Sequence, residues 1–255
     1  MLPLADPLFY ALAVPAVMLA GLSKGGFGGS IGMLAVPLMA LAIPPVQAAG
    51  ILLPILVVMD LIGLFAYRGV YDRRSLVLLL PAGIAGVGVG WATASLVEDA
   101  HVTLLVGLLC LLFVGERFRP RRQGSDAPRG HRPLAGAFWG SVAGFTSFVS
   151  HTGGPPFQLY MVPLRLAPSL FAGTAVIFFS AINAVKLVPY FYLGQFDARN
   201  LATAAVLLPL APLSTFAGVW LVKRVKPQTF YGVIYAAMTV IGVKLVYDGV
   251  TRLFG

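Results

Sequence analysis

The stretch GLSKGGFGGS, residues 21–30, places one lysine and five glycines inside an otherwise apolar part of the chain. A second stretch, GFTSFVSHTGGPPFQ at 144–158, combines glycines and prolines with polar side chains in the same way. In lipid, non-helical backbone is tolerated only where protein or a water-filled cavity surrounds it. The two breaks therefore predict a helical membrane protein that encloses polar groups.

The composition around these breaks is that of an integral membrane protein. Hydrophobic residues make up 58% of the 255 residues and charged residues 11%, and the mean hydropathy is +0.89, which excludes an ordinary soluble domain. Apolar segments approach the roughly 20 residues that cross a bilayer as a helix, without the alternation of barrel strands. They lie at 8–22, 31–43, 47–67, 75–97, 101–116, 134–149, 157–166, 169–193, 200–222 and 228–249.

Basic residues and the single cysteine narrow the class further. The formal net charge is +9, but six of the eighteen basic residues lie in the one long polar stretch, 116–133, which indicates membrane orientation rather than nucleic-acid binding. Cys110 stands alone in an apolar segment, so an intramolecular disulfide and a multi-cysteine metal site are excluded. The first residues have no basic start, so we expect a retained segment rather than a cleaved signal peptide.

The two halves of the chain match each other. PVQAAG at 45–50 matches PSLFAG at 168–173, an offset of 123 that also pairs Asp60 with Asn183 and Tyr67 with Tyr190. Further pairs follow in the same order with small drift: Gly28-Gly29 with Gly153-Gly154, Asp72 with Asp197, Leu76 with Leu201, LLP 79–81 with LLP 207–209, and Gly90 with Gly218. The series predicts two repeats, residues 1–115 and 134–255, joined by a cytoplasmic basic loop at 116–133.

The positive-inside rule orients these repeats. With the 116–133 loop inside, the basic turns at 68–74 and 223–226 also fall inside, whereas the N-terminus falls outside. The predicted fold is an all-α polytopic membrane protein with two inverted repeats. Each repeat has a Gly-rich broken or re-entrant helix pair followed by three transmembrane helices. The short segments of each pair favour a re-entrant hairpin over two full crossings.

Inverted repeats with glycine and proline breaks at corresponding positions are typical of secondary transporters, whose substrate site lies near the bilayer midplane. Glycine lets backbone approach a ligand closely, and amides at the start of a half-helix attract anions. The predicted substrate-binding residues are Ser23, Lys24, Gly25, Gly26, Gly28, Gly29, Ser150, His151, Thr152, Gly153, Gly154, Gln158, Asn183 and Lys186. Alternatively, glycines only allow close helix packing, which we favour for Gly86, Gly88 and Gly90.

Ionisable side chains within the apolar segments indicate the ligand. Lys24 and Lys186 are costly in a bilayer unless a cavity or a partner receives them. Alternatively, Lys186 could reach the outer interface, and Lys24 could lie at a hairpin tip near water. Asp60 and His151 are candidates for carrying a coupling ion, but Asp60 could equally pair with a lysine and His151 could be structural. Because positive groups outnumber negative ones, the expected substrate is a small inorganic or organic anion.

Three stretches carry a family resemblance: GLSKGGFGGSIGMLAVPLMAL at 21–41, GFTSFVSHTGGPPFQLYMVPLRL at 144–166 and AGTAVIFFSAINAVKLVPYFYLGQF at 172–196. They resemble the sulfite exporter TauE/SafE family of bacterial membrane permeases, and the resemblance spans roughly 8–250. It implies a polytopic inner-membrane carrier that exports sulfite, sulfonates such as sulfoacetate, or related small anions.

These observations predict a secondary exporter of sulfite or an organosulfonate rather than an enzyme. No ATP-binding motif is present, so we expect no cofactor, and an H+ gradient, an Na+ gradient or the anion's own gradient to drive export. Two alternatives are an intramembrane enzyme that uses His151 with a serine, and a non-transporting membrane scaffold or assembly factor. The sequence is also compatible with a homodimer.

Overall fold

The computed structural model describes residues 4–27, 29, 31–94, 99–118 and 130–254, and all regular structure in these ranges is helical. The elements are α1 Pro7–Lys24, η1 Ile31–Leu34, α2 Ala35–Met39, α3 Pro45–Ala66, α4 Arg73–Ala92, α5 Asp99–Phe118, α6 Pro133–Ser150, α7 Gly154–Met161, η2 Val162–Leu164, α8 Pro168–Tyr192, α9 Ala198–Leu207, α10 Leu210–Arg224 and α11 Pro227–Phe254. Most of the predicted 116–133 loop lies outside the described residues.

Aspartates begin several of the long helices. Asp72 accepts a hydrogen bond from the amide of Ser75 at the start of α4, and Asp197 accepts one from Asn200 at the start of α9, both at 2.8 Å. A side-chain acceptor at this position satisfies one of the amides that a helix leaves free in its first turn. Asp72 and Asp197, which the sequence match pairs, thus have the same local role.

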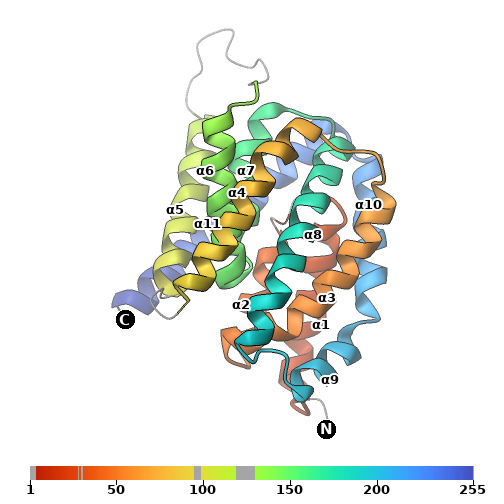
Figure 1. The fold of residues 1–255 in the computed structure, drawn as a ribbon, viewed down its shortest axis with the longest axis vertical. Helices are drawn as coiled ribbons and strands as arrows, with labels where there is room; N and C mark the ends of the chain where they lie inside the picture. The colour runs from red at the N-terminus through yellow and green to blue at the C-terminus, as the bar shows by residue number, and fades with distance from the viewer. Residues whose placement is uncertain (1–3, 28, 30, 95–98, 119–129, 255) are drawn as a thin grey trace.

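The long helices run along the molecule in both directions. In Figure 1, α1, α3, α5 and α10 lead away from the end that holds the N-terminus, whereas α4, α6, α8 and α11 lead back toward it. The α3–α4, η2–α8 and α10–α11 connections gather at the end opposite the N-terminus, which we call the basic end because its turns carry basic residues. These residues are Arg68, Arg73, Arg74, Arg132, Arg165, Lys223, Arg224 and Lys226.

Five helices are long and apolar enough to cross a membrane: Pro7–Lys24, Val46–Ala66, Arg73–Ala92, Pro168–Tyr192 and Gln228–Leu253. The predicted segment 200–222 is instead divided into α9 and α10, which are bent by 49° and together make a sixth candidate span. The break contains Pro209, and proline lacks the backbone N–H that a continuous helix needs. The chain is therefore a multi-pass helical membrane protein.

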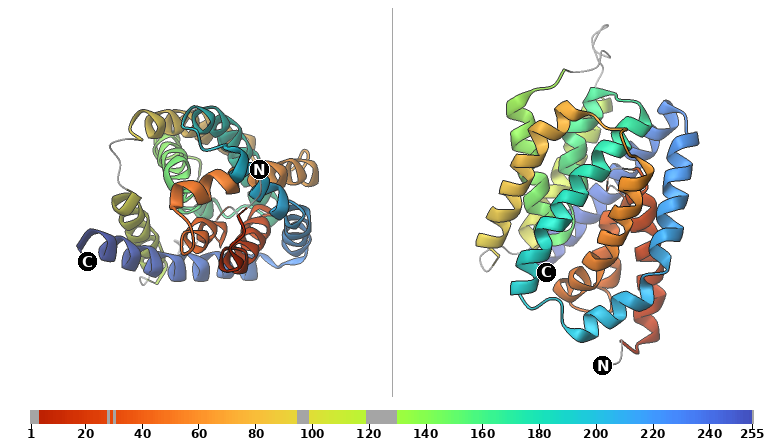
Figure 2. Two further views of the ribbon diagram at one scale, coloured as in Figure 1. Left: turned by 90° about the horizontal axis from the view of Figure 1, so that it is seen from below. Right: turned by 45° about the vertical axis from the view of Figure 1, so that its right-hand side comes forward.

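The two Gly-rich pairs each combine a long arm with a short one. Helices α1 and α6 both have 18 residues, but the helices that follow their breaks, α2 and α7, have only 5 and 8. At about 1.5 Å per residue, neither short helix can cross a hydrocarbon core of roughly 30 Å. Seen along the long axis, the short α2 lies inside a ring of longer helices (Figure 2). Each pair thus has one arm too short to span the membrane, and the re-entrant hairpin stays a prediction.

Close helix packing accounts for Gly86 and Gly90, two of the three glycines for which the sequence favoured a packing role. A Cβ on Gly86 would lie 2.1 Å from the carbonyl oxygen of Ser141, and one on Gly90 would lie 2.9 Å from the Phe148 ring. These two glycines therefore let α4 pack directly on α6. Gly88 has open space around it, so the packing interpretation is wrong there. Cys110 is fully buried, as a small core residue would be.

Candidate functional site

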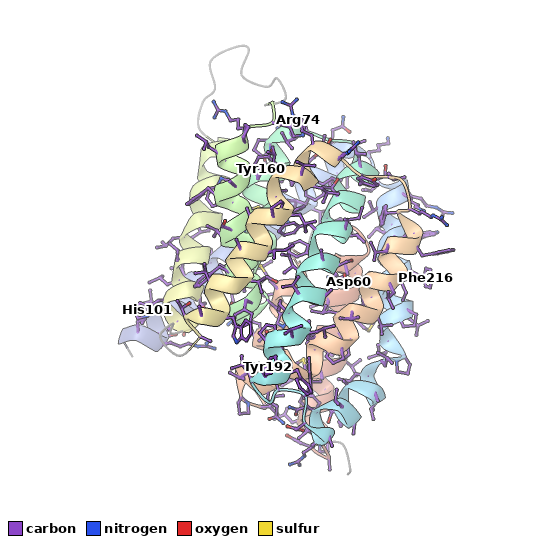
Figure 3. All side chains as sticks on the ribbon, in the orientation of Figure 1. Asp60, Arg74, His101, Tyr160, Tyr192 and Phe216 are labelled. Atoms are coloured by element: carbon purple, nitrogen blue, oxygen red, sulfur yellow. The ribbon has the colours of Figure 1, made fainter. Side chains whose placement is uncertain are left out.

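The two Gly-rich breaks meet around one small cavity. Its volume is about 40 Å³, enough for about three waters at 10–15 Å³ each. It is lined by Ala20, Ser23, Lys24, Gly29, Gly32, Leu52, Leu56, Ser147, His151, Gly154, Phe179 and Asn183. Asp60, which bonds two of these residues, lies about midway between the top and the bottom of the ribbon in Figure 3, where Arg74 is near the top. The cavity is thus close to the middle of the chain's long axis.

An ion pair forms one wall of the site. The Lys24 ammonium donates to one carboxylate oxygen of Asp60 at 2.5 Å, and the Asn183 amide donates to the other at 2.7 Å. Asp60 is buried, and so is most of the Lys24 side chain. The sequence left open whether Asp60 pairs with a lysine, and the structure contains that pair. Lys24 is not at a water-exposed hairpin tip, and it also lies 5.6 Å from the centre of the Phe179 ring.

A second buried lysine, Lys186, lies behind two cavity-lining residues, Ser147 and His151. Lys186 is fully buried, so the alternative that it reaches the interface is wrong. Its ammonium donates to the Ser147 carbonyl oxygen at 2.6 Å and lies 2.9 Å from Nδ1 of His151. Because an ammonium only donates, Nδ1 is the acceptor, which leaves the ring proton on Nε2. Nε2 lies 3.3 Å from the Tyr190 hydroxyl.

His151 owes its position to the end of α6. It follows Ser150 as the C-cap and has φ 55°, in the left-handed region. A left-handed residue is a common way to end a helix, although glycine usually fills that position. The turn directs the chain into α7, whose first residue, Gly154, also lines the cavity. The positive end of the α7 dipole therefore faces the same space as Lys24.

Two tyrosines make equivalent hydrogen bonds at the two breaks. The Tyr67 hydroxyl donates to the Gly25 carbonyl at 2.6 Å, and the Tyr190 hydroxyl donates to the Phe148 carbonyl at 3.0 Å. The donors are 123 residues apart in the chain, and so are the acceptors. The sequence match paired the tyrosines but gave no indication that they bind the breaks.

The structure divides the predicted binding residues into two groups. The first group lines the cavity: Ser23, Lys24, Gly29, His151, Gly154 and Asn183. Lys186 does not line it but contacts two lining residues, Ser147 and His151. Gly28 lies outside the described residues. The remaining predicted residues lie elsewhere: Gly25, Gly26, Ser150, Thr152, Gly153 and Gln158.

Each residue of the second group has a structural role. A Cβ on Gly25 would lie 2.6 Å from Cα of Gly218, so Gly25 lets α1 pack on α10. Ser150 and Thr152 bond each other at 2.8 Å and border a separate cavity of about 20 Å³. The Gln158 amide donates to the Phe27 carbonyl at 3.1 Å. Gly26 has φ 154° beneath Tyr67, and Gly153 lies against the Ala143 carbonyl. At Gly25, Gly26 and Gly153 a Cβ would meet neighbouring atoms, so these glycines allow close packing, and their role in binding stays a prediction.

The sequence reasoning missed Ser147 and Phe179. Ser147 lines the cavity and holds Lys186, and Phe179 covers Lys24. Helical spacing carried the necessary signal, because Ser147 lies four residues before His151, and Phe179 lies four residues before Asn183.

The site offers hydrogen-bond donors for an anion. The hydroxyls of Ser23 and Ser147 and the charge of Lys24 could replace water around an anion. In the part of the chain that the structure describes, no group of three His, Cys, Asp or Glu side chains could hold a metal. The nitrogens of His151 face Lys186 and Tyr190, and neither supplies the carboxylate that orients a histidine base.

Comparisons with known proteins identify the family of the chain. The family model described as Sulfite exporter TauE/SafE matches residues 13–245, which nearly coincides with the span of the resemblance in the sequence. No curated protein and no solved structure gave a match. A family match that includes both breaks and every cavity-lining residue means that the chain belongs to the sulfite exporter TauE/SafE family.

Proposed function

We propose that this chain is a secondary transporter that exports a small anion, sulfite or an organosulfonate, across the bacterial inner membrane. The TauE/SafE family is a family of membrane transporters for export of this type. The observation that carries the proposal is the central cavity, where Ser23 and Lys24 from α1 and Asn183 from α8 surround a space fit for a few atoms. A compact anion matches both its size and its donors.

We further propose that the chain works by alternating access between two inverted repeats. Helices α3 and α8 begin 123 residues apart and run in opposite directions in Figure 1. The contact of α1 with α10 has its counterpart in the contact of α6 with α4. The two tyrosine hydrogen bonds supply a third correspondence. Asp60 bonds its own sequence partner, Asn183, as residues close to a two-fold axis would.

The proposed orientation places the basic end in the cytoplasm and the N-terminus outside, because basic connections are retained inside. We propose an ion gradient or the anion's own gradient as the energy source, with no cofactor. An enzymatic role would need a base that a carboxylate or a metal orients, and a scaffold would have no use for buried lysines around a cavity.

Anion flux from proteoliposomes tests the proposal. Vesicles that contain the purified protein are loaded with radiolabelled sulfite, and efflux is compared with protein-free vesicles. We expect protein-dependent efflux that Lys24→Gln/Asp60→Asn reduces, because this double variant alters the wall without leaving a buried charge unpaired. Lys226→Gln is the matched control, since Lys226 is exposed at the basic end. Efflux equal to that of empty vesicles for sulfite and for simple sulfonates would refute the proposal.

A further inference from the structure

The charged groups around the cavity do not balance. Lys24 on α1 is neutralised by Asp60 on α3. Lys186 on α8 adds a further positive charge when its amine is protonated, and it pairs with neither of them. His151 on α6 is neutral in the arrangement above, because its Nδ1 accepts from Lys186. The residues that α4, α7 and α10 bring near this cavity are uncharged, and Arg73, Arg74, Lys223 and Arg224 lie at the helix ends beyond it.

Lys186 has neutral partners in the described structure. Its ammonium contacts the carbonyl and hydroxyl oxygens of Ser147 and one nitrogen of His151. Asp60 accepts hydrogen bonds from Lys24 and Asn183, and in the described residues it makes none with Lys186. A buried cation without a counter-ion is strongly unfavourable. Ser147 and His151 line the cavity, so an anion placed there would be one residue layer from Lys186.

We propose that this cavity selects anions that carry a single negative charge, and that Asp60 sets this preference. The inference rests on the proposed transport of an anion and narrows its substrate class. A monoanion brings the buried charges to zero, whereas a dianion leaves an excess negative charge in a medium of low dielectric constant. Hydrogen sulfite and simple alkyl sulfonates then fit the site, and sulfate, sulfoacetate and dicarboxylates do not.

Asp60 is the residue that sets the preference for a monoanion over a dianion. By neutralising Lys24 it leaves one uncompensated positive charge instead of two. Asp60→Asn keeps nearly the same shape, and it leaves Lys24 and Lys186 both uncompensated. The variant should therefore prefer a dianion. Lys24→Gln/Asp60→Asn removes one charge of each sign, so it should keep the preference of the natural protein for a monoanion.

Methanesulfonate and sulfate are the appropriate pair of probes, because they are tetrahedral ions of similar size with one and two negative charges. Sulfite is unsuitable here, since it exists in both charge states near neutral pH. Binding is measured as thermal stabilisation of the purified protein at fixed ionic strength, and transport as counterflow in proteoliposomes. We expect the natural protein to favour methanesulfonate by at least about tenfold, a modest share of the energy of one unit charge at these distances.

The outcomes separate this inference from the transport proposal. Reversal of the preference in Asp60→Asn, with its retention in Lys24→Gln/Asp60→Asn, supports the inference. Equal or tighter binding of sulfate by the natural protein overturns it and leaves an anion transporter. If Asp60→Asn fails to fold, Lys186→Gln decides, because a site without excess charge should lose at least about tenfold in affinity for methanesulfonate; undiminished affinity would overturn the inference. Absence of flux for both probes and for sulfite would refute the transport proposal itself.

Discussion

The ion pair between Lys24 and Asp60 gives a prediction whose size follows from burial. Asp60 is only 4% exposed in the natural protein, so Lys24→Ala leaves a buried carboxylate whose remaining partner is the neutral amide of Asn183. Breaking a buried pair by removing one member costs about 3–5 kcal/mol. We therefore expect Lys24→Ala, and likewise Asp60→Asn, to lower the free energy of unfolding by amounts in this range.

The double variant Lys24→Ala/Asp60→Asn tests the cause. Because it removes both charges, its loss should be smaller than the sum of the single losses by about 1–3 kcal/mol. Unfolding would be followed by circular dichroism in an SDS titration of the detergent-solubilised protein, with Lys226→Ala as the control for a lost exposed lysine. Strict additivity of the single losses, or a loss for Lys24→Ala no larger than that for Lys226→Ala, would refute the reasoning.

Three further predictions concern positions away from the cavity. Gly86→Ala should destabilise the protein by about 1–3 kcal/mol because a Cβ there meets the backbone of α6, whereas Gly88→Ala should change stability by less than about 0.5 kcal/mol; melting temperatures of the two variants compare them directly. Tyr67→Phe should cost about 1–3 kcal/mol, since the Gly25 carbonyl loses its donor in a buried place, and an unchanged SDS midpoint would show the bond to be unimportant. At Asp72, burial raises the carboxyl pKa, but hydrogen bonds from Ser75 and His131 outweigh it and hold the pKa below 3.8. A lowered folded pKa means that this stabilisation is complete above the ordinary aspartate pKa and is lost as the pH falls through the folded value. Melting curves below about pH 4 should therefore fall less steeply in Asp72→Asn than in the natural protein, and parallel curves would contradict this.

Much of the fold could be predicted because its causes are local. Apolar segment length gave the membrane helices, and the aspartates at 72 and 197 begin helices as their side chains favour. The division of the 200–222 segment was not predicted, because a proline inside an apolar segment does not always break the helix. Pro81 lies inside an unbroken α4, whereas Pro209 lies at the break between α9 and α10. The same LLP sequence thus has two outcomes, and the three local residues alone do not distinguish them.

The site was harder to predict than the fold, for a physical reason. A glycine at a break allows close approach of either a ligand or another helix, because it has no Cβ in both cases. The sequence therefore does not distinguish the two roles. Gly29 and Gly154 face the cavity, whereas Gly25 faces Gly218 on α10. Only the three-dimensional packing distinguishes them. Charged residues were easier to assign, because burial of Lys24 and Lys186 demands partners that a sequence can supply in few places.

The two tyrosine hydrogen bonds have different surroundings, which matters for the proposed alternation. At the Tyr67 bond, Gly25 lies against Gly218, so two helix backbones touch beneath the basic end. The corresponding contact at Tyr190 places the Phe148 side chain on Gly90, beside a cavity of about 300 Å³.

These surroundings set different requirements for opening the two ends. Helix α10 would have to separate from α1 before an anion could leave past Tyr67. On the other side, Tyr190 and Phe148 line that larger cavity, and Tyr190 contacts His151, which lines the central one. Movement of side chains could connect these two spaces, whereas the basic end needs movement of a helix. In the proposed cycle, the conformation described by the structure is therefore closer to opening away from the cytoplasm.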